Sequence, residues 1–380
     1  MERLEEHWLD VSGLQWKSKK RVRHGVERTC WLILSFFFIS ATCAVAAPRE
    51  ALAASSHDTE VQVEIAEWLK KMDEALEQRS YTGRLVHQVG EEVRQVRLLH
   101  ARVEGERFFR IQLLGGDASE IILRGNEFIC LQPESEANGF RQVSLVQSDR
   151  FRKMAERLPE LSRYYKFSLL SPKKICGRQA IGIAIQARDS YRLHHQLWLD
   201  VETALVLKGA VISQEHAVLE QFEFAEIDTD EQLTARDFDA EPPDARRLFS
   251  DARPSERSQP NMAILSRFEW LPPGFRPAER EVRKLRGAMP DMESVMFSDG
   301  MTSFTVFVER KRPANSPTSV AYEPIALPDV RQGATLTHSR LARLANEVGG
   351  LEPVVTTVMG EITFPAAKKV LQAFNGDRLH

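Results

Sequence analysis

The sequence has almost no excess of charge of either sign. It contains 51 lysines and arginines against 54 aspartates and glutamates, so its formal net charge is −3. A nucleic-acid-binding protein normally carries a basic face or a basic domain, and this sequence has only short, local basic clusters. The composition therefore predicts no nucleic-acid partner, and no strong field that would select another charged partner.

Cysteine is also scarce. Of the four cysteines, Cys30 and Cys43 lie in the apolar N-terminal segment described below, which leaves Cys130 and Cys176. In an oxidising compartment these two could form a disulfide, but pairing cannot be read from spacing alone. Two separate buried thiols on strands are at least as good an interpretation.

The motifs that usually carry chemistry are missing. There is no Gly-x-Ser-x-Gly elbow, no phosphate-binding loop, no dinucleotide-binding glycine pattern, no His-Glu-x-x-His and no Cys-x-x-Cys. His194 and His195 are adjacent beside a predicted strand, where neighbouring side chains point to opposite faces, so they cannot easily share a metal. Asp189, Asp200 and Glu202 could pair as carboxylates for acid–base work, but no nucleophile or second base is placed near them.

The segment Asp200-Val-Glu-Thr203 is instead typical of a hairpin turn that Asp200 caps. We therefore expect no enzyme activity, no catalytic residue, no metal and no cofactor.

The N-terminus has the order of features found in a secretory signal. Basic residues between Lys17 and Arg28 precede an uncharged apolar run from Thr29 to Ala47, which contains Ala44-Val-Ala46. This order predicts a signal peptide over residues 1–46, cleaved after Ala46, and hence export. An uncleaved membrane anchor is the alternative, because the uncharged run is just long enough to span a bilayer.

The period of the apolar residues changes from helical to alternating after residue 79. Residues 61–79 predict a helix. Alternating runs then predict two groups of strands on either side of a helical stretch at 151–165, namely 81–88, 92–103, 107–114, 119–124 and 127–132, followed by 165–170, 179–187, 194–200, 204–212 and 218–227. Residues 61–230 are therefore predicted to form a curved antiparallel sheet, partly closed into a barrel, with covering helices.

A polar segment rich in proline at 231–260 predicts a linker. Beyond it, residues 262–374 predict a smaller α+β domain, with a few strands and an amphipathic C-terminal helix over 364–374. Pro365 lies in the first turn of that helix, where proline is tolerated. The predicted fold class is therefore α+β, in two domains.

Alternation also gives the larger sheet an extensive apolar face. The favoured interpretation is a filled core covered by helices, because apolar stripes on strands usually pack against something. The alternative is a partly open groove for acyl chains or an apolar peptide, and alternation leaves its inward face ambiguous by one residue. The candidate groove residues are Leu113, Ile121, Phe128, Leu197, Leu199, Leu205, Leu207, Phe222 and Phe224.

Several segments, taken together and in order, resemble the periplasmic sigma-E regulators known as RseB and MucB. In the larger domain they are Ser80-Tyr-Thr-Gly83, Ser119-Glu-Ile-Ile-Leu-Arg-Gly-Asn126, Leu161-Ser-Arg-Tyr-Tyr165, Asp189-Ser-Tyr-Arg-Leu-His-His-Gln-Leu-Trp-Leu-Asp200, Thr203-Ala-Leu-Val-Leu207 and Leu219-Glu-Gln-Phe-Glu-Phe224. In the smaller domain they are Leu271-Pro-Pro-Gly-Phe275, Ser298-Asp-Gly-Met-Thr-Ser-Phe-Thr-Val-Phe-Val308 and Thr357-Val-Met-Gly-Glu361. Cys176 departs from the pattern, which has an apolar residue there.

The resemblance implies a half-open β-barrel similar to the lipoprotein carriers LolA and LolB, joined by a linker to a smaller α+β domain. It implies a periplasmic protein that binds the periplasmic domain of a transmembrane anti-sigma factor similar to RseA or MucA. Binding would shield that domain from the protease that makes the first cut, until lipid, lipopolysaccharide or lipoprotein acyl chains release it. A periplasmic lipoprotein or lipid carrier is the alternative function, and homo-oligomers are left open.

Overall fold

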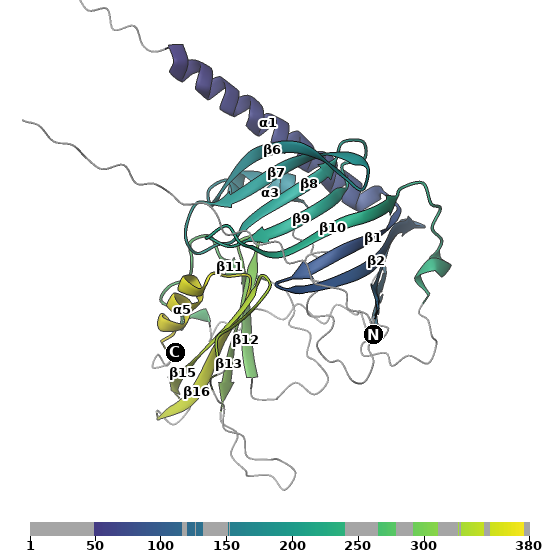
Figure 1. Ribbon diagram of the computed structural model, residues 1–380. Coiled ribbons are helices and arrows are strands. Elements are labelled where there is room, and N and C mark those ends of the chain that lie inside the picture. The colour runs from purple at the N-terminus through teal and green to yellow at the C-terminus, as the bar shows by residue number, and fades with distance from the viewer. Residues whose placement is uncertain are drawn as a thin grey trace, which may run out of the picture. The chain divides into compact units, whose positions relative to one another are not determined.

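Two antiparallel sheets with α-helices packed against them form the described part of the chain (Figure 1). The computed structural model describes residues 49–115, 120–125, 127–131, 151, 153–239, 265–278, 292–310, 326, 328–345 and 350–375. From Glu50 onward the chain is one compact unit, and the contacts reported below lie within it. The predicted signal peptide and its cleavage site lie outside the described residues. None of the described helices is long and apolar enough to cross a membrane.

The larger sheet has ten strands in the order β5-β4-β3-β2-β1-β10-β9-β8-β7-β6. Strands β1 and β10, the first and last in sequence, pair at its centre (Figure 1). The two edge strands, β5 and β6, stand at opposite ends of the order, so the sheet stays open, as a half-open barrel requires. The strands are β1 Tyr81–Val89, β2 Glu92–Val103, β3 Glu106–Leu114, β4 Glu120–Arg124, β5 Glu127–Leu131, β6 Tyr165–Ile175, β7 Arg178–Ala187, β8 His194–Asp200, β9 Val206–Ile212 and β10 Val218–Asp228.

Two helices pack against the inner face of this sheet. Helix α1 (Arg49–Gln78) begins before the predicted 61–79 and buries Ile65, Leu69 and Met72, which recur at helical spacing. Helix α3 (Met154–Leu161) lies within the predicted 151–165. The carboxylate of Asp73 on α1 accepts the backbone N–H groups of Met154 and Ala155, at 3.1 and 3.0 Å. One helix therefore caps the first turn of the other.

Two glycines on the inner face let aromatic rings lie directly on neighbouring strands. A Cβ on Gly209 of β9 would stand 2.5 Å from the ring of Phe222 on β10. A Cβ on Gly83 of β1 would stand 2.7 Å from the ring of Phe224. Both rings are buried, so the absence of a side chain at each glycine determines how closely the centre of the sheet packs.

A short segment after β10 covers part of the outer face. It contains the 3-10 helix η3 (Ala235–Phe238), whose Phe238 packs with Ala101 and Ile122. Arg110 and Arg124 donate hydrogen bonds to carbonyl oxygens of this segment, at 2.8 and 2.9 Å. Residues 231–239, at the start of the predicted linker, therefore pack on the larger sheet.

The smaller sheet has six strands in the order β11-β12-β13-β16-β15-β14. Helix α5 (Phe364–Gln372) packs on it through Ala366, Ala367, Val370 and Leu371. Thr363 caps this helix and proline occupies its first turn, as predicted. The strands are β11 Arg276–Pro277, β12 Met292–Ser298, β13 Ser303–Arg310, β14 Val330–Gln332, β15 Thr335–Ala345 and β16 Leu351–Gly360. The α+β fold class is therefore confirmed.

The contact between Gly209 and Phe222 generates a stability prediction. Gly209→Ala should lower the free energy of unfolding by about 1–3 kcal/mol, because the added methyl overpacks a buried ring. Urea unfolding followed by tryptophan fluorescence would measure the loss. The control is Val218→Ala on the neighbouring strand, a side chain that is 46% exposed, where we expect a change below about 0.5 kcal/mol. Equal stability of the two variants would contradict the packing argument.

Candidate functional site

The predicted groove residues line the inner face of the larger sheet, where they form core. Leu113 is partly buried, and Ile121, Leu197, Leu199, Leu205, Phe222 and Phe224 are at most 4% exposed. All seven pack in one cluster with the apolar stripe of α1. The interior is therefore filled by the protein's own helices, which is the favoured interpretation of the apolar face.

Two of the predicted residues stand apart from this cluster. Leu207 is buried in a different cluster, with Trp198 and Ile175. The cause is a register shift between Trp198 and Leu199 where β8 pairs with β9, because a bulge reverses the alternation that the sequence pattern assumes. Phe128 lies on β5, whose side chains are outside the described part of the structure.

The smaller sheet contributes two turns to the same interior. Met301, in the turn between β12 and β13, is 2% exposed, and Ala334, in the turn between β14 and β15, is fully buried. Both belong to the core cluster of the larger sheet. We call these the 299–302 turn and the 333–334 turn. The interior of the larger sheet is therefore completed by residues that follow its last strand by about 70 to 110 positions in the sequence.

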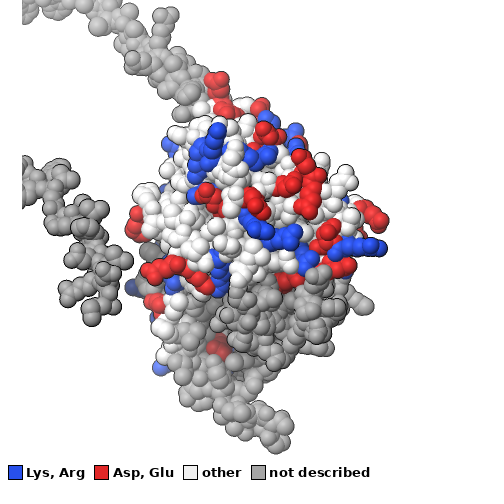
Figure 2. Space-filling model, turned by 45° about the vertical axis from the view of Figure 1, so that its right-hand side comes forward, with Lys and Arg blue, Asp and Glu red and all other residues white. Residues whose placement is uncertain are grey.

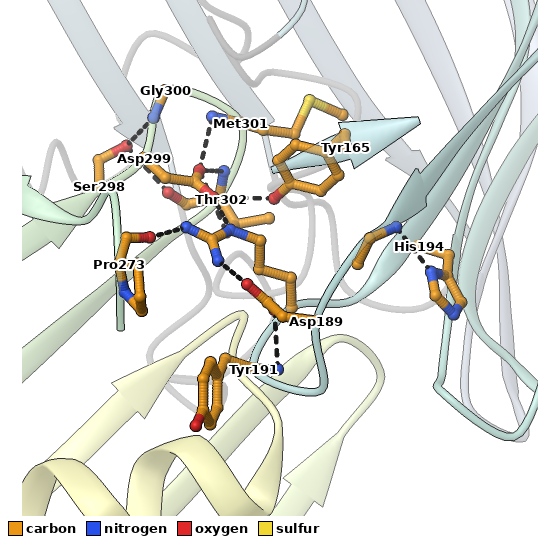
Figure 3. Close-up of polar contacts among 12 residues, drawn as sticks. Tyr165, Asp189, Tyr191, His194, Pro273, Ser298, Asp299, Gly300, Met301 and Thr302 are labelled. Atoms are coloured by element: carbon orange, nitrogen blue, oxygen red, sulfur yellow. Dashed lines mark hydrogen bonds and ion pairs between the residues drawn. The ribbon is translucent and has the colours of Figure 1, made fainter. Parts of the chain in front are cut away.

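Arg192, just before β8, lies at the centre of the contact between the sheets. Its side chain is fully buried, and its Nε donates to Asp299 Oδ2 at 2.7 Å. Its Nη1 donates to Asp189 and its Nη2 to the backbone oxygen of Pro273. Figure 3 shows these acceptors converging on one point from the two sheets. The guanidinium is thus hydrogen-bonded on each of its three nitrogens, as a buried cation requires.

Aromatic rings cover the faces of the guanidinium. Its central carbon lies 4.5 Å from the ring centroid of Tyr164 and 4.9 Å from that of Phe275, a stacking geometry that arginine favours. Gly274 makes this approach possible: its φ is +86° and a Cβ there would stand 2.4 Å from the Tyr164 ring. Only glycine fits both conditions.

The two oxygens of the Asp299 carboxylate have separate tasks. Oδ1 accepts the backbone N–H groups of Met301 and Thr302, both at 2.9 Å, and so holds the 299–302 turn. Oδ2 accepts from Arg192 and, at 2.9 Å, from the hydroxyl of Tyr165 on β6. One oxygen therefore shapes the turn, while the other joins it to the larger sheet (Figure 3).

The electrostatics keep the Arg192 guanidinium charged. Burial by itself lowers the pKa of Arg192, but the Asp299 carboxylate outweighs burial and raises the pKa above its ordinary value. Burial, and next the negative charge of Asp299, raise the pKa of Tyr165 well above its ordinary value. Tyr165 therefore stays protonated and donates its hydrogen bond.

A second polar contact holds the 333–334 turn. The backbone N–H of Ala334 donates to Oε2 of Glu220 on β10 at 3.4 Å. Oε1 of the same carboxylate lies 3.0 Å from Nε2 of His87 on β1, and both side chains are buried. A third contact, from Thr363 Oγ1 to the backbone oxygen of Ser190, measures 2.7 Å. The sheets therefore meet through several buried hydrogen bonds.

The structure does not bring together Asp189, Asp200, His194 and His195, the residues considered for acid–base chemistry or for a shared metal. Asp189 pairs with Arg192 and Asp200 pairs with Arg178. His195 is buried on the inner face beside the Tyr165 ring, whereas His194 accepts the N–H of Ala187 at 2.9 Å, and burial lowers its pKa. The described residues contain no group of three or more His, Cys, Asp or Glu side chains that could hold a metal.

The cysteine prediction remains a prediction. Cys176, in the turn between β6 and β7, forms no disulfide with any residue whose side chain is described, and burial raises the pKa of its thiol. The side chain of Cys130 on β5 lies outside the described part. Strand β5, which carries Cys130, and strand β6, which ends next to Cys176, lie at opposite edges of the sheet.

Charges on the molecular surface are mixed. On the face drawn in Figure 2, lysines and arginines are interspersed with aspartates and glutamates over the described residues. No stripe of one sign crosses the described residues of that face, in keeping with the small net charge.

Pattern reasoning missed the polar centre of the site. Arg192, Tyr165 and Asp299 lie in recognised segments, but they were not singled out. Asp299 holds the turn between β12 and β13. The partner of Asp299 is 107 residues away, and nothing in local sequence spacing indicates that pairing.

Comparisons with known proteins cover both sheets. The MucB/RseB N-terminal domain matches residues 64–242 and the MucB/RseB C-terminal domain matches residues 266–375. The sigma factor AlgU regulatory protein MucB of Pseudomonas aeruginosa is 26% identical over 315 residues, 80% of this chain and 89% of its own length. The sigma-E factor regulatory protein RseB of Escherichia coli K12 is 26% identical over 260 residues, 65% of this chain and 76% of its own.

Solved structures show the same fold. The complex of MucA and MucB from Pseudomonas aeruginosa superposes with a TM-score of 0.61 at 21% identity, covering 83% of this chain and all of that chain. A crystal structure of MucB superposes with a TM-score of 0.54 at 21% identity, covering 82% of this chain and 97% of that chain.

The turn after β8 yields a pH-dependent stability prediction. Asp200 accepts from Thr203 N and Oγ1, at 3.1 and 2.5 Å, as the sequence predicted, and from Arg178 at 2.9 Å. Burial acts to raise its pKa, but these hydrogen bonds outweigh burial and lower it. The ionised carboxylate therefore stabilises the fold above the ordinary aspartate pKa of about 3.9, and this stabilisation is lost as the pH falls through the lowered folded value.

Asp200→Asn should cost about 1–3 kcal/mol at pH 7, and the difference from the parent should shrink as urea unfolding is repeated towards pH 3. The control is Glu202→Gln, which removes the other carboxylate on Arg178. Its side chain is 79% exposed, so we expect a change within about 0.5 kcal/mol. A pH-independent loss in Asp200→Asn would show that the charge plays no part.

Proposed function

The chain belongs to the MucB/RseB family, and on that basis we propose that it is a periplasmic negative regulator of a sigma factor. It binds the periplasmic domain of a transmembrane anti-sigma factor and shields it from the protease that makes the first cut. The observation that carries this proposal is the match of both sheets, in order, to MucB, a protein solved in complex with MucA.

The arrangement of the strands in two separate sheets supports a two-domain organisation of the proposed binding protein. We propose domains at 61–230 and 262–374 joined by a linker at 231–260, each domain built on one of the two sheets. Export by the predicted signal peptide at 1–46, with cleavage after Ala46, would place both in the periplasm with the partner.

Binding without catalysis fits the polar groups of the molecule. Asp189, Asp200 and Arg192 hold turns or the contact between the sheets, and groups committed to such hydrogen bonds and ion pairs serve structure better than chemistry. We therefore propose that the protein acts by occupying its partner. A ligand that prefers the released state then shifts the population of complexes, and lipid, lipopolysaccharide or lipoprotein acyl chains are the ligands we propose.

A periplasmic lipoprotein or lipid carrier is the second candidate. The apolar interior favours it, since the nine predicted groove residues include seven that line one continuous apolar cluster. The two turns of the smaller sheet that complete this cluster weigh against it, because a carrier needs its interior free for cargo.

The decisive measurement is protection from proteolysis. The chain from Ala47 onward is mixed with the periplasmic domain of the anti-sigma factor encoded beside it, and the first-cut protease is added. At about ten times the Kd most of the substrate is bound, so the cleavage rate should fall by about tenfold. Addition of lipopolysaccharide should restore the rate.

Cleavage of an unrelated peptide by the same protease serves as the control and should be unaffected. Unchanged cleavage of the anti-sigma domain at saturating protein would reject the regulator. Acyl lipids recovered in stoichiometric amounts from the purified protein would then favour the carrier.

A further inference from the structure

The smaller sheet closes the interior of the larger one with very little apolar surface. Only the side chains of Met301 and Ala334 from its described residues join that core cluster. Ala334 contributes a single methyl group, and the apolar gain grows with buried area. The hydrophobic effect alone therefore provides a small part of the attachment at these turns, and the directional polar contacts matter more.

Those polar contacts differ in strength. The 333–334 turn is held by a neutral N–H donor, 3.4 Å from Glu220. The 299–302 turn is held by the ion pair of Arg192 and Asp299, whose side chains are both fully buried. Hydrogen bonds between ionised groups are shorter and stronger than those of neutral donors. Because a buried charge that loses its partner is strongly penalised, the ion pair opposes separation most.

We propose that Arg192 and Asp299 form a latch between the two sheets. While the latch is closed, both turns stay seated in the interior of the larger sheet. When it opens, the 299–302 and 333–334 turns leave together, and the apolar interior beneath Met301 and Ala334 is uncovered. The molecule then has two states, closed and open, that differ in exposed apolar surface.

The latch does not depend on the proposed regulatory function. It concerns only contacts within this chain, and it would operate in a carrier as well as in a regulator. If the proposed regulatory function is correct, a ligand with an apolar chain could bind the uncovered interior. Such a ligand would favour the open state, because it binds the open state more tightly than the closed one.

Asp299→Asn tests the latch without destroying the turn. The Oδ1 of asparagine can still accept the N–H groups of Met301 and Thr302, whereas its Nδ2 places a donor opposite the Arg192 and Tyr165 donors. The measured quantity is the rate of thiol labelling in the 333–334 turn. Ala334→Cys, in the chain from Ala47 with Cys130→Ser and Cys176→Ser, is labelled by a maleimide only when the 333–334 turn leaves the core.

We expect Asp299→Asn to speed labelling at position 334 by about tenfold or more. Tyr165→Phe removes a single hydrogen bond to Asp299 and should give a smaller increase in the same direction. If Asp299→Asn fails to fold, the labelling rate of the Tyr165→Phe variant tests the latch instead. If the thiol at 334 reacts at the rate of a free thiol in the parent, the turn is not seated in the core and the closed state of the latch is overturned.

Two controls separate the latch from other effects. Glu202→Gln changes a carboxylate outside the latch, on a side chain that is 79% exposed, so it should leave labelling at 334 unchanged. A second reporter, Ala101→Cys, lies fully buried beneath η3 and reports unfolding of the larger sheet. Parent-like labelling at 334 in Asp299→Asn would overturn the latch. An equal increase at 101 and 334, or an equal effect of Glu202→Gln, would overturn it too.

Discussion

The contact between the two sheets depends on one buried ion pair. Arg192 and Asp299 would be costly to bury singly, and they are tolerated because every nitrogen of the guanidinium and both oxygens of the carboxylate have partners. The same carboxylate shapes the turn that carries Met301 into the core of the larger sheet. Charge pairing, turn geometry and core packing therefore meet at one carboxylate.

The interior of the larger sheet explains how a filled core and a binding role can coexist. Its inner face packs against α1 and α3, so the sheet is a stable scaffold and not an empty container. The part covered by the smaller sheet is different, because only two short turns close it. Under the proposed latch, this boundary is the part of the molecule that opens while the frame of the larger sheet stays folded.

The pairing of β1 with β10 gives the larger sheet its frame. Strands β2 to β5 extend from one side of this pair and β9 to β6 from the other. Each group is made of consecutive hairpins, whose contacts are local in sequence, while the central pair joins residues more than a hundred positions apart. Gly83 and Gly209 let Phe224 and Phe222 fill the centre, so the longest-range pairing is also among the most closely packed.

Local chemistry determined much of the structure from the sequence by itself. Alternation located the strands within a few residues, the apolar stripe located α1 from Ile65 to Met72, and side-chain chemistry placed Asp200 as a turn cap and Pro365 in the first turn of α5. These features depend on neighbours along the chain. The ordered motifs also identified the family, although no single motif would have done so. Only the tertiary structure decided that Leu207 faces away from the predicted groove, since a bulge shifts its register. It alone decided that Ala334 completes the core of the other sheet and that Arg192 meets Asp299. These outcomes depend on groups far apart in sequence, and pairing over such distances is set by how whole sheets pack, which no local period encodes.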